Sequence, residues 1–247
     1  MIIASDRDQR RMYGDLAWVW PIMSNPGEYV HESERFAALI KQYAQIQTRT
    51  LLNLGCGGGN NDNTLKKHFE VTGTDISEGM LANAKRLNPE VRYLAGDMRT
   101  LRLGETFDAV VVFDSISYMQ AESELLAVFQ TAFEHLKPGG AFVTYQENDP
   151  RTFKQNAVRH QIESKANTEL VFIENYYDPD PADTTIEGTF LYLIRKSGEL
   201  HVEMDRHVLG IFPRKIWLTL LRKTGFHVKV LEGTPEECTA FVCMRPQ

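Results

Sequence analysis

The sequence predicts an α/β protein: a mostly parallel sheet carrying an inserted antiparallel sheet. Three observations lead to this fold class. Strand-like and helix-like segments alternate between residues 50 and 147, strand-like segments follow one another after residue 148, and a helix with two closing strands completes the chain. Alternation favours parallel strands joined by right-handed crossovers, whereas consecutive strands favour antiparallel pairing.

The alternating part contains five candidate strands, each a short apolar or β-branched run. They cover residues 50–54, 69–77 (ending near Asp75), 91–98, 107–115 and 141–147. Helices are expected between them over 61–68, 78–88 and 121–140, the last closed by a Lys-Pro-Gly-Gly sequence. The fourth run is so apolar that we expect it to be buried on both faces.

The rest of the chain surrounds this unit. Residues 6–47 have helical spacing with a break around 24–29, and strands are predicted over 170–177, 185–195 and 200–209. A helix between Pro213 and Gly225 precedes closing strands at 226–233 and 238–245. We therefore expect one domain over 1–247, with an N-terminal helical cap (1–34) and an inserted antiparallel lid (148–210).

Composition narrows the class of protein. The 247 residues are 43% hydrophobic and 24% charged, with a net charge of −6 and three cysteines. An acidic chain argues against a nucleic-acid partner, and three cysteines without metal spacing favour a reducing cytoplasm. No apolar leader and no run of about 18 apolar residues is visible, so we expect no membrane association.

A glycine-rich loop follows the first strand. Its sequence, Gly-Cys-Gly-Gly-Gly-Asn over residues 55–60, lets the backbone approach a ligand closely because no Cβ intervenes. A dinucleotide-binding fingerprint requires glycine at the sixth position, where Asn60 stands. Taken alone, the loop is equally compatible with a tight turn and with a cofactor site.

Two acidic residues strengthen the interpretation as a cofactor site. Asp75 ends the second strand about 20 residues after Gly55, where a carboxylate accepts hydrogen bonds from ribose hydroxyls. Asp97 follows the third strand and is positioned to accept from an adenine amine, with Met98 against the ring. Structural alternatives are a helix cap for Asp75 and a turn for Asp97.

In this order, the segments LLNLGCGGG, VTGTDIS, AGDM, FDAVVVFDSISYM and LKPGG resemble the class I S-adenosylmethionine-dependent methyltransferases. The similarity is good over residues 35–147 and looser beyond. It implies a Rossmann-like seven-stranded sheet whose last strand is antiparallel. The sheet inserted after the fifth strand resembles the lid of small-molecule N-methyltransferases that act on amino sugars or glycine.

The resemblance also implies a set of contacts with S-adenosylmethionine. Gly55 and Gly57 would approach its methionine part, Asp75 its ribose, and Ile76 its adenine. The other residues implied are Asn53, Cys56, Met80, Asp97, Met98, Phe113 and Asp114. One departure is Asn53, where the family usually has an acid; the amide keeps the shape but loses a charge that favours the cofactor's ammonium group.

Methyl transfer from a sulfonium requires alignment and exclusion of water more than a special catalytic group. Candidate proton acceptors are Glu147, Tyr118 and His207, each with a structural alternative. Aromatic residues that are candidates for the acceptor pocket are Tyr13, Trp20, Tyr29 and Tyr177. No residue spacing indicates a metal.

We predict a methyltransferase for a small molecule, with an amine acceptor favoured over a hydroxyl. The alternatives are a non-catalytic S-adenosylmethionine-binding protein and a nucleotide-dependent oxidoreductase, which Asn60 disfavours. Nucleic-acid methylation is disfavoured by the charge and by the absence of an Asn-Pro-Pro-aromatic motif after the fourth strand. An exposed lid strand also offers a surface for a homodimer.

Overall fold

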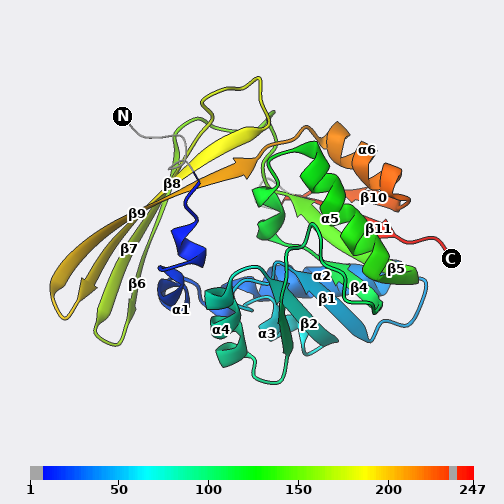
Figure 1. Cartoon of the computed structure of the whole chain (residues 1–247), viewed down its shortest axis with the longest axis horizontal. Helices are drawn as coiled ribbons and strands as arrows, with labels where there is room; N and C mark the ends of the chain where they lie inside the picture. Colours follow the sequence, from blue (N-terminus) through cyan, green and yellow to red (C-terminus); the bar gives the residue numbers. More distant parts are fainter. Residues whose placement is uncertain (1–7, 234–237) are drawn as a thin grey trace.

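Seven strands form the main sheet in the computed structural model, which describes residues 8–233 and 238–247 (Figure 1). Their order is β10-β11-β5-β4-β1-β2-β3. The bounds are β1 Thr50–Leu54, β2 Glu70–Asp75, β3 Arg92–Ala95, β4 Phe107–Val111, β5 Leu136–Gln146, β10 His227–Leu231 and β11 Thr239–Met244.

The pairing confirms the predicted topology. Strands β1 to β5 pair in parallel, while β11 is antiparallel to both β5 and β10. All five residues of β4 are buried, as its apolar sequence predicts. The chain runs from β1 outward to β3 and then returns to β4 on the other side of β1. The carboxyl ends of β1 and β4 therefore flank the switch point where ligands bind in such sheets.

Helices cover both faces of this sheet. Helices α5 (Glu122–His135) and α6 (Arg214–Thr224) pack with β4, β5 and β11 in one apolar cluster. On the other face a second cluster joins the sheet to α2 (Val30–Tyr43), α3 (Asp62–Leu65) and α4 (Glu78–Leu87). This three-layer arrangement leaves the carboxyl edge of the strands open to the second sheet.

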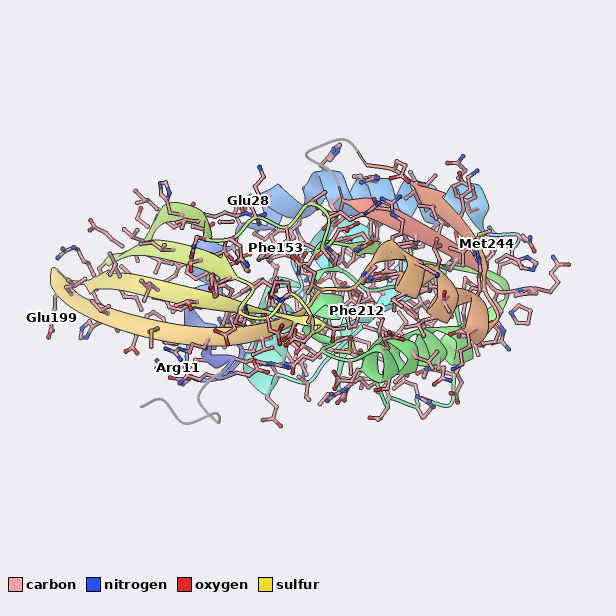
Figure 2. All side chains as sticks on the ribbon, turned by 90° about the horizontal axis from the view of Figure 1, so that it is seen from above. Arg11, Glu28, Phe153, Glu199, Phe212 and Met244 are labelled. Atoms are coloured by element: carbon pink, nitrogen blue, oxygen red, sulfur yellow. The ribbon has the colours of Figure 1, made fainter. Side chains whose placement is uncertain are left out.

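The second sheet contains four antiparallel strands in chain order and projects away from the main sheet (Figure 1). Its strands are β6 (Ala157–Lys165), β7 (Thr168–Tyr177), β8 (Thr185–Lys196) and β9 (Glu199–Gly210). Figure 2 shows Glu199 at its far tip, while Phe153 and Phe212 lie at the junction with the main sheet. The sequence predicted only three of these strands, because β6 is too polar to give a clear strand pattern.

The N-terminal segment lies between the two sheets (Figure 1). The backbone amides of Arg11 and Met12 donate to the carboxylate of Asp205 on β9, and an apolar cluster joins Met12 and Leu16 to both α4 and the second sheet. This segment is less helical than predicted: short turns η2 (Arg11–Tyr13), η3 (Ala17–Val19), α1 (Trp20–Met23) and η4 (Pro26–Tyr29) precede α2. Its two prolines and two glycines interrupt a continuous helix.

One further boundary differs from the prediction. The Lys-Pro-Gly-Gly sequence was expected to close the helix before the fifth strand, whereas β5 already begins at Leu136 and includes it. A register shift between β4 and β5 at Phe107 and Ala109 accommodates the proline. Among the described residues, no helix is long and apolar enough to cross a membrane.

Candidate active site

The loop after β1 exposes glycine backbone at the carboxyl edge of the sheet, and we call the open space beside Gly57 the groove. Gly55, Gly57 and Gly59 have φ values of 72°, 53° and 78°, which favour glycine. The amides of Gly55 and Cys56 donate to the Thr74 carbonyl at 2.7 and 2.8 Å, so the loop is fixed to β2. A Cβ on Gly55 would collide with Ser115, whereas one on Gly57 would meet no atom within 4 Å. The groove is therefore open at Gly57.

Asp75, the last residue of β2, lies beside this loop. Its two carboxylate oxygens accept from the amides of Gly57 and Ser77, both at 2.8 Å. Burial raises the pKa of this carboxyl, while those amides favour its ionised form. Two oxygens still retain acceptor sites for the hydroxyls of a ribose. Ile76 is 69% exposed beside it, as expected of an apolar surface for a flat ring.

Asp97 lies further along the same edge, half-buried beside Met98. Its carboxylate forms an ion pair with Arg99 at 2.7 Å, and Arg99 holds the pKa of Asp97 below its usual range. Arg99 also binds Glu124 on α5. Asp97 is thus fixed as an ionised acceptor at the edge of the groove.

At the end of β1, Asn53 is buried, and its Nδ2 donates to Asp62 Oδ1 at 2.8 Å. Its Oδ1 has no hydrogen-bond partner among the described residues. Phe113 is buried and stacks on Phe36 with ring centroids 4.6 Å apart. Four features together fit S-adenosylmethionine: glycine backbone with open space at Gly57, an aspartate for a ribose, the exposed aliphatic side chain of Ile76, and a buried acceptor without a partner.

Two predicted cofactor contacts differ from the rest. Cys56 is buried in the apolar cluster behind the loop, so only its backbone belongs to the groove edge. Met80 is fully buried with Met12 and Leu170 beneath the N-terminal segment, so it presents no surface for a ligand. The structure therefore does not support Met80 as a contact: its position in the first turn of α4 directs it into the core.

A cavity of about 900 Å³ opens beyond the groove, at the carboxyl end of β5. Carboxylates of α2, η5 (Asp114–Tyr118) and the residue after β5 face it at one end: Glu32, Asp114 and Glu147. Cations from distant parts of the chain line it: Arg35, Arg151, Lys154, Arg159 and Arg214. We refer to these two sets of side chains as the acidic end and the basic wall, and they adjoin each other: Arg35 favours the charged form of Glu32 and Arg159 that of Glu147. Two of the cations also have ion-pair partners of their own, Arg151 with Asp149 and Arg214 with Glu232.

Burial and mutual repulsion shape the acidic end. Burial, and then the nearby Asp114, raise the pKa of Glu147 to about 7, and Ser117 Oγ donates to its carboxylate at 3.2 Å. The same two causes raise the pKa of Glu32 to about 7. Burial also raises the pKa of Asp114, which accepts from the Tyr145 hydroxyl. Glu32 and Glu147 therefore exchange protons near neutral pH.

His207 lies in a different environment from the one predicted. It is fully buried, with Nε2 2.7 Å from Asp205 Oδ2 and Nδ1 2.6 Å from the Tyr118 hydroxyl. Tyr118 in turn donates to the Tyr13 hydroxyl at 3.0 Å. Because Phe190 also covers its ring at 4.3 Å, His207 does not reach the cavity. It contacts Tyr118 and can act only through that residue.

The predicted substrate aromatics separate into two groups. Trp20 packs against Gly58 of the loop, where a Cβ would come within 2.1 Å of its Nε1, and the Tyr29 hydroxyl contacts Ser24 Oγ at 2.6 Å. Tyr177, in contrast, is 45% exposed on the outer face of the second sheet, and its neighbour Tyr176 lines the cavity. Because side chains alternate along a strand, Tyr176 lines the cavity and Tyr177 lies outside it.

The residues that sequence reasoning missed are those of the cavity wall. Glu32 and Arg35 lie on α2, Tyr145 on β5 and Arg159 on β6. Of these four, only Tyr145 could have been proposed from the sequence, because it lies on the predicted strand that leads to Glu147. Among the described residues no cluster of His, Cys, Asp and Glu has the geometry to hold a metal ion.

Residues 51–140 match the methyltransferase domain family. A relative from Streptomyces venezuelae, a dTDP-3-amino-3,4,6-trideoxy-alpha-D-glucopyranose N,N-dimethyltransferase, is 29% identical over 87% of this chain and 90% of its own. A dTDP-3-amino-3,6-dideoxy-alpha-D-glucopyranose N,N-dimethyltransferase from Streptomyces fradiae is also 29% identical, over 84% of this chain and 81% of its own.

Solved structures, including one of an amino pentose methyltransferase, have a similar fold. DesVI of Streptomyces venezuelae superposes with a TM-score of 0.81 at 25% identity over the full length of both chains. CalS10, an amino pentose methyltransferase from Micromonospora echinaspora solved with S-adenosylmethionine bound, gives 0.77 at 25% identity over 88% of this chain and 91% of its own.

Fold, groove and comparisons together define an S-adenosylmethionine-dependent enzyme that transfers a methyl group. The chain is an S-adenosylmethionine-dependent methyltransferase of small molecules, and it is similar over most of its length to N,N-dimethyltransferases of nucleotide-linked amino sugars. These similarities confirm the resemblance to class I S-adenosylmethionine-dependent methyltransferases and argue against the oxidoreductase alternative.

Proposed function

We propose that this enzyme methylates the amino group of a nucleotide-linked amino sugar. The observation that carries the proposal is the cavity beside the cofactor groove, whose acidic end suits an amine and whose basic wall suits a diphosphate. The relatives from Streptomyces venezuelae and Streptomyces fradiae act on dTDP-linked amino sugars, which present both groups.

The basic wall supports the diphosphate assignment. Arg35, Arg159 and Arg214 converge on one cavity from three separate elements, α2, β6 and α6. Guanidinium groups bind phosphate oxygens through paired hydrogen bonds, so several of them on one wall suit a dianionic linker. The chain as a whole has a net charge of −6, whereas five Lys or Arg side chains and four carboxylates line this cavity.

The acidic end supports an amine acceptor. An amino sugar arrives largely as an ammonium ion, which must lose a proton before its nitrogen can attack. Glu147 faces Asp114, Arg159, Glu174 and Ser117, and its pKa of about 7 suits a group that takes up that proton. The cofactor supplies an activated methyl group; the protein's tasks are to position the nitrogen, exclude water and accept the proton.

Other residues have proposed roles in the groove and its cover. We assign the ribose to Asp75, the adenine to Ile76, Asp97 and Met98, and the methionine part to the backbone of Gly55, Gly57 and Phe113. Tyr13, Trp20 and Tyr29 of the cap (1–34) would cover the reacting groups, with Tyr118 beside them. Residues 148–210 would form the lid over the acceptor, in a single domain spanning 1–247.

We also propose that the outer face of the lid joins two copies of the chain. Two rows of apolar side chains cross it, one from Ile162 to Val202 and one from Ile173 to Met204. Ile162 and Val202 are 70% and 59% exposed. Four strands about 4.8 Å apart and ten residues long, at about 3.4 Å each, give a face of about 650 Å². That approaches the roughly 800 Å² per partner of a standard interface.

The dimer is tested by light scattering during size-exclusion chromatography. The wild type should elute as a dimer, and lysine at both Ile162 and Val202 should give a folded monomer, while Glu199→Lys at the lid tip should remain dimeric. A wild type that is monomeric at tens of micromolar would refute the proposal.

The substrate proposal is tested by turnover on matched acceptors. Among dTDP-linked amino sugars, their hydroxyl analogues and the free amino sugars, we expect methylation only where both the amine and the diphosphate are present. Glu147→Gln should lower kcat at least tenfold and abolish the rise of kcat with pH through about 7. Equal turnover of free and nucleotide-linked sugars would contradict the role of the basic wall.

A further inference from the structure

A buried carboxylate lies behind the glycine loop at a position the cofactor contacts do not include. Asp62, the first residue of α3, has no exposed surface, and its Oδ1 accepts from Asn53 Nδ2 at 2.8 Å. Among the ion pairs of the described residues none involves Asp62, since the nearby Lys66 pairs with Glu90 at 2.7 Å. A buried carboxylate without a cation is costly unless something compensates it.

The neighbouring strand provides room for this carboxylate. Gly73 of β2 lies opposite it, and a Cβ there would come within 3.0 Å of Asp62 Oδ2 and 2.5 Å of the Tyr93 ring. Asp62 and Tyr93 therefore occupy space that any other residue at position 73 would fill. The Asp62 carboxylate is therefore buried by residues of β2, β3 and α3, and its burial does not depend on the conformation of one loop.

The Asn53 amide, which binds Asp62, lies near the carboxyl end of β1, two residues before Gly55 of the loop. Because its Nδ2 is held by Asp62, the orientation of its Oδ1 is fixed, and that oxygen is buried and has no partner among the described residues. An orphan acceptor at the carboxyl end of β1 lacks a donor, and an ammonium group provides one together with the missing positive charge.

We infer that Asp62 replaces the carboxylate missing at the end of β1, and that it acts as a positioning residue for the cofactor. Asp62 holds the Asn53 amide so that Oδ1 accepts from the methionine ammonium of S-adenosylmethionine. The negative charge lies one side chain further from the groove, behind the amide. Asn53 and Asp62 thus form one unit in which the acid and the direct contact are divided between two residues.

The test compares two ligands on three variants by isothermal titration. S-adenosylhomocysteine carries the ammonium group, whereas 5′-methylthioadenosine lacks the amino-acid part. Asp62→Asn should raise the Kd of S-adenosylhomocysteine about tenfold and leave that of 5′-methylthioadenosine within twofold. In the exchange variant Asn53→Asp/Asp62→Asn, the Kd of S-adenosylhomocysteine should return to within threefold of wild type. Asn53→Asp alone should be less stable, because two buried carboxylates at hydrogen-bonding distance cannot both ionise.

Equal weakening of both ligands by Asp62→Asn would show a merely structural role and overturn the inference, as would an unchanged Kd for S-adenosylhomocysteine. If Asp62→Asn does not fold, the exchange variant decides: near-wild-type affinity for S-adenosylhomocysteine supports the pair, and a tenfold loss in a folded protein overturns it. Neither result depends on the identity of the methyl acceptor.

Discussion

Replacing Asp75 with alanine removes two kinds of interaction at once. Its carboxylate accepts from the amides of Gly57 and Ser77, and it is the proposed acceptor for the ribose hydroxyls. A hydrogen bond to a charged group contributes about 1.5–3 kcal/mol, so losing the ribose contact alone weakens binding by about ten- to a hundredfold. The freed amide of Gly57 loosens the loop further, and we expect a Kd about 100-fold higher.

Isothermal titration with S-adenosylhomocysteine measures the change. Asp75→Asn retains the shape and one acceptor oxygen, so its Kd should rise only about tenfold. Asp183→Ala is the matched control, since Asp183 also accepts from a backbone amide, that of Thr185, and lies on an exposed turn of the second sheet. A change below twofold for Asp75→Ala, in a folded protein, would remove Asp75 from the site.

Three further predictions concern stability, loop packing and lid register. Lys137 and the backbone around Thr50 outweigh burial and lower the pKa of Asp108 to about 2, below about 3.9 in the unfolded chain. The stabilisation by Asp108 is therefore present above pH 4 and is lost as the pH falls through about 2. Asp108→Ala should lower the free energy of unfolding, measured by urea denaturation, by about 2–4 kcal/mol, and a decrease of less than about 0.5 kcal/mol would contradict this. Gly58→Ala should weaken S-adenosylhomocysteine binding because its Cβ meets Trp20, and the effect should shrink in a Trp20→Ala background; an undiminished effect would exclude the clash. Tyr176→Ala should raise the KM for the acceptor at least fivefold, while Tyr177→Ala should change it less than twofold. The reverse order would show that Tyr177, as the sequence predicted, is the residue that contacts the acceptor.

Where the apolar pattern was strong, the sequence was sufficient to predict the fold. Strands β1, β2 and β4 are buried runs between turn signals, and their order with the glycine loop identified the family. Strand β6 gave no such signal, because its inner face contacts the N-terminal segment through polar groups. Gln161 and Lys165 donate to the carbonyls of Met23 and Pro21, at 2.8 and 3.1 Å. Those partners are more than 130 residues away, so no local pattern identifies them.

The candidate site divides in the same way. Groove residues such as Asp75 follow strands directly, and a short motif therefore positions them. The cavity wall is assembled from residues as far apart as Arg35 and Arg214, which only the tertiary fold brings together. His207 was a candidate proton acceptor with a structural alternative, and its contacts favour the alternative. Asp205 and Tyr118 bind its two ring nitrogens within the protein.

The lid leaves the main sheet after Gln146 and returns just before Arg214, so one uninterrupted stretch of chain contributes β6–β9. Recombination or gene conversion at these two junctions would replace most of one wall of the acceptor cavity while leaving every groove residue from Asn53 to Asp114 intact. Under the proposed roles, the stretch that surrounds much of the acceptor is separate in the chain from the residues that hold the methyl donor, so the first can change in sequence while the second stays constant.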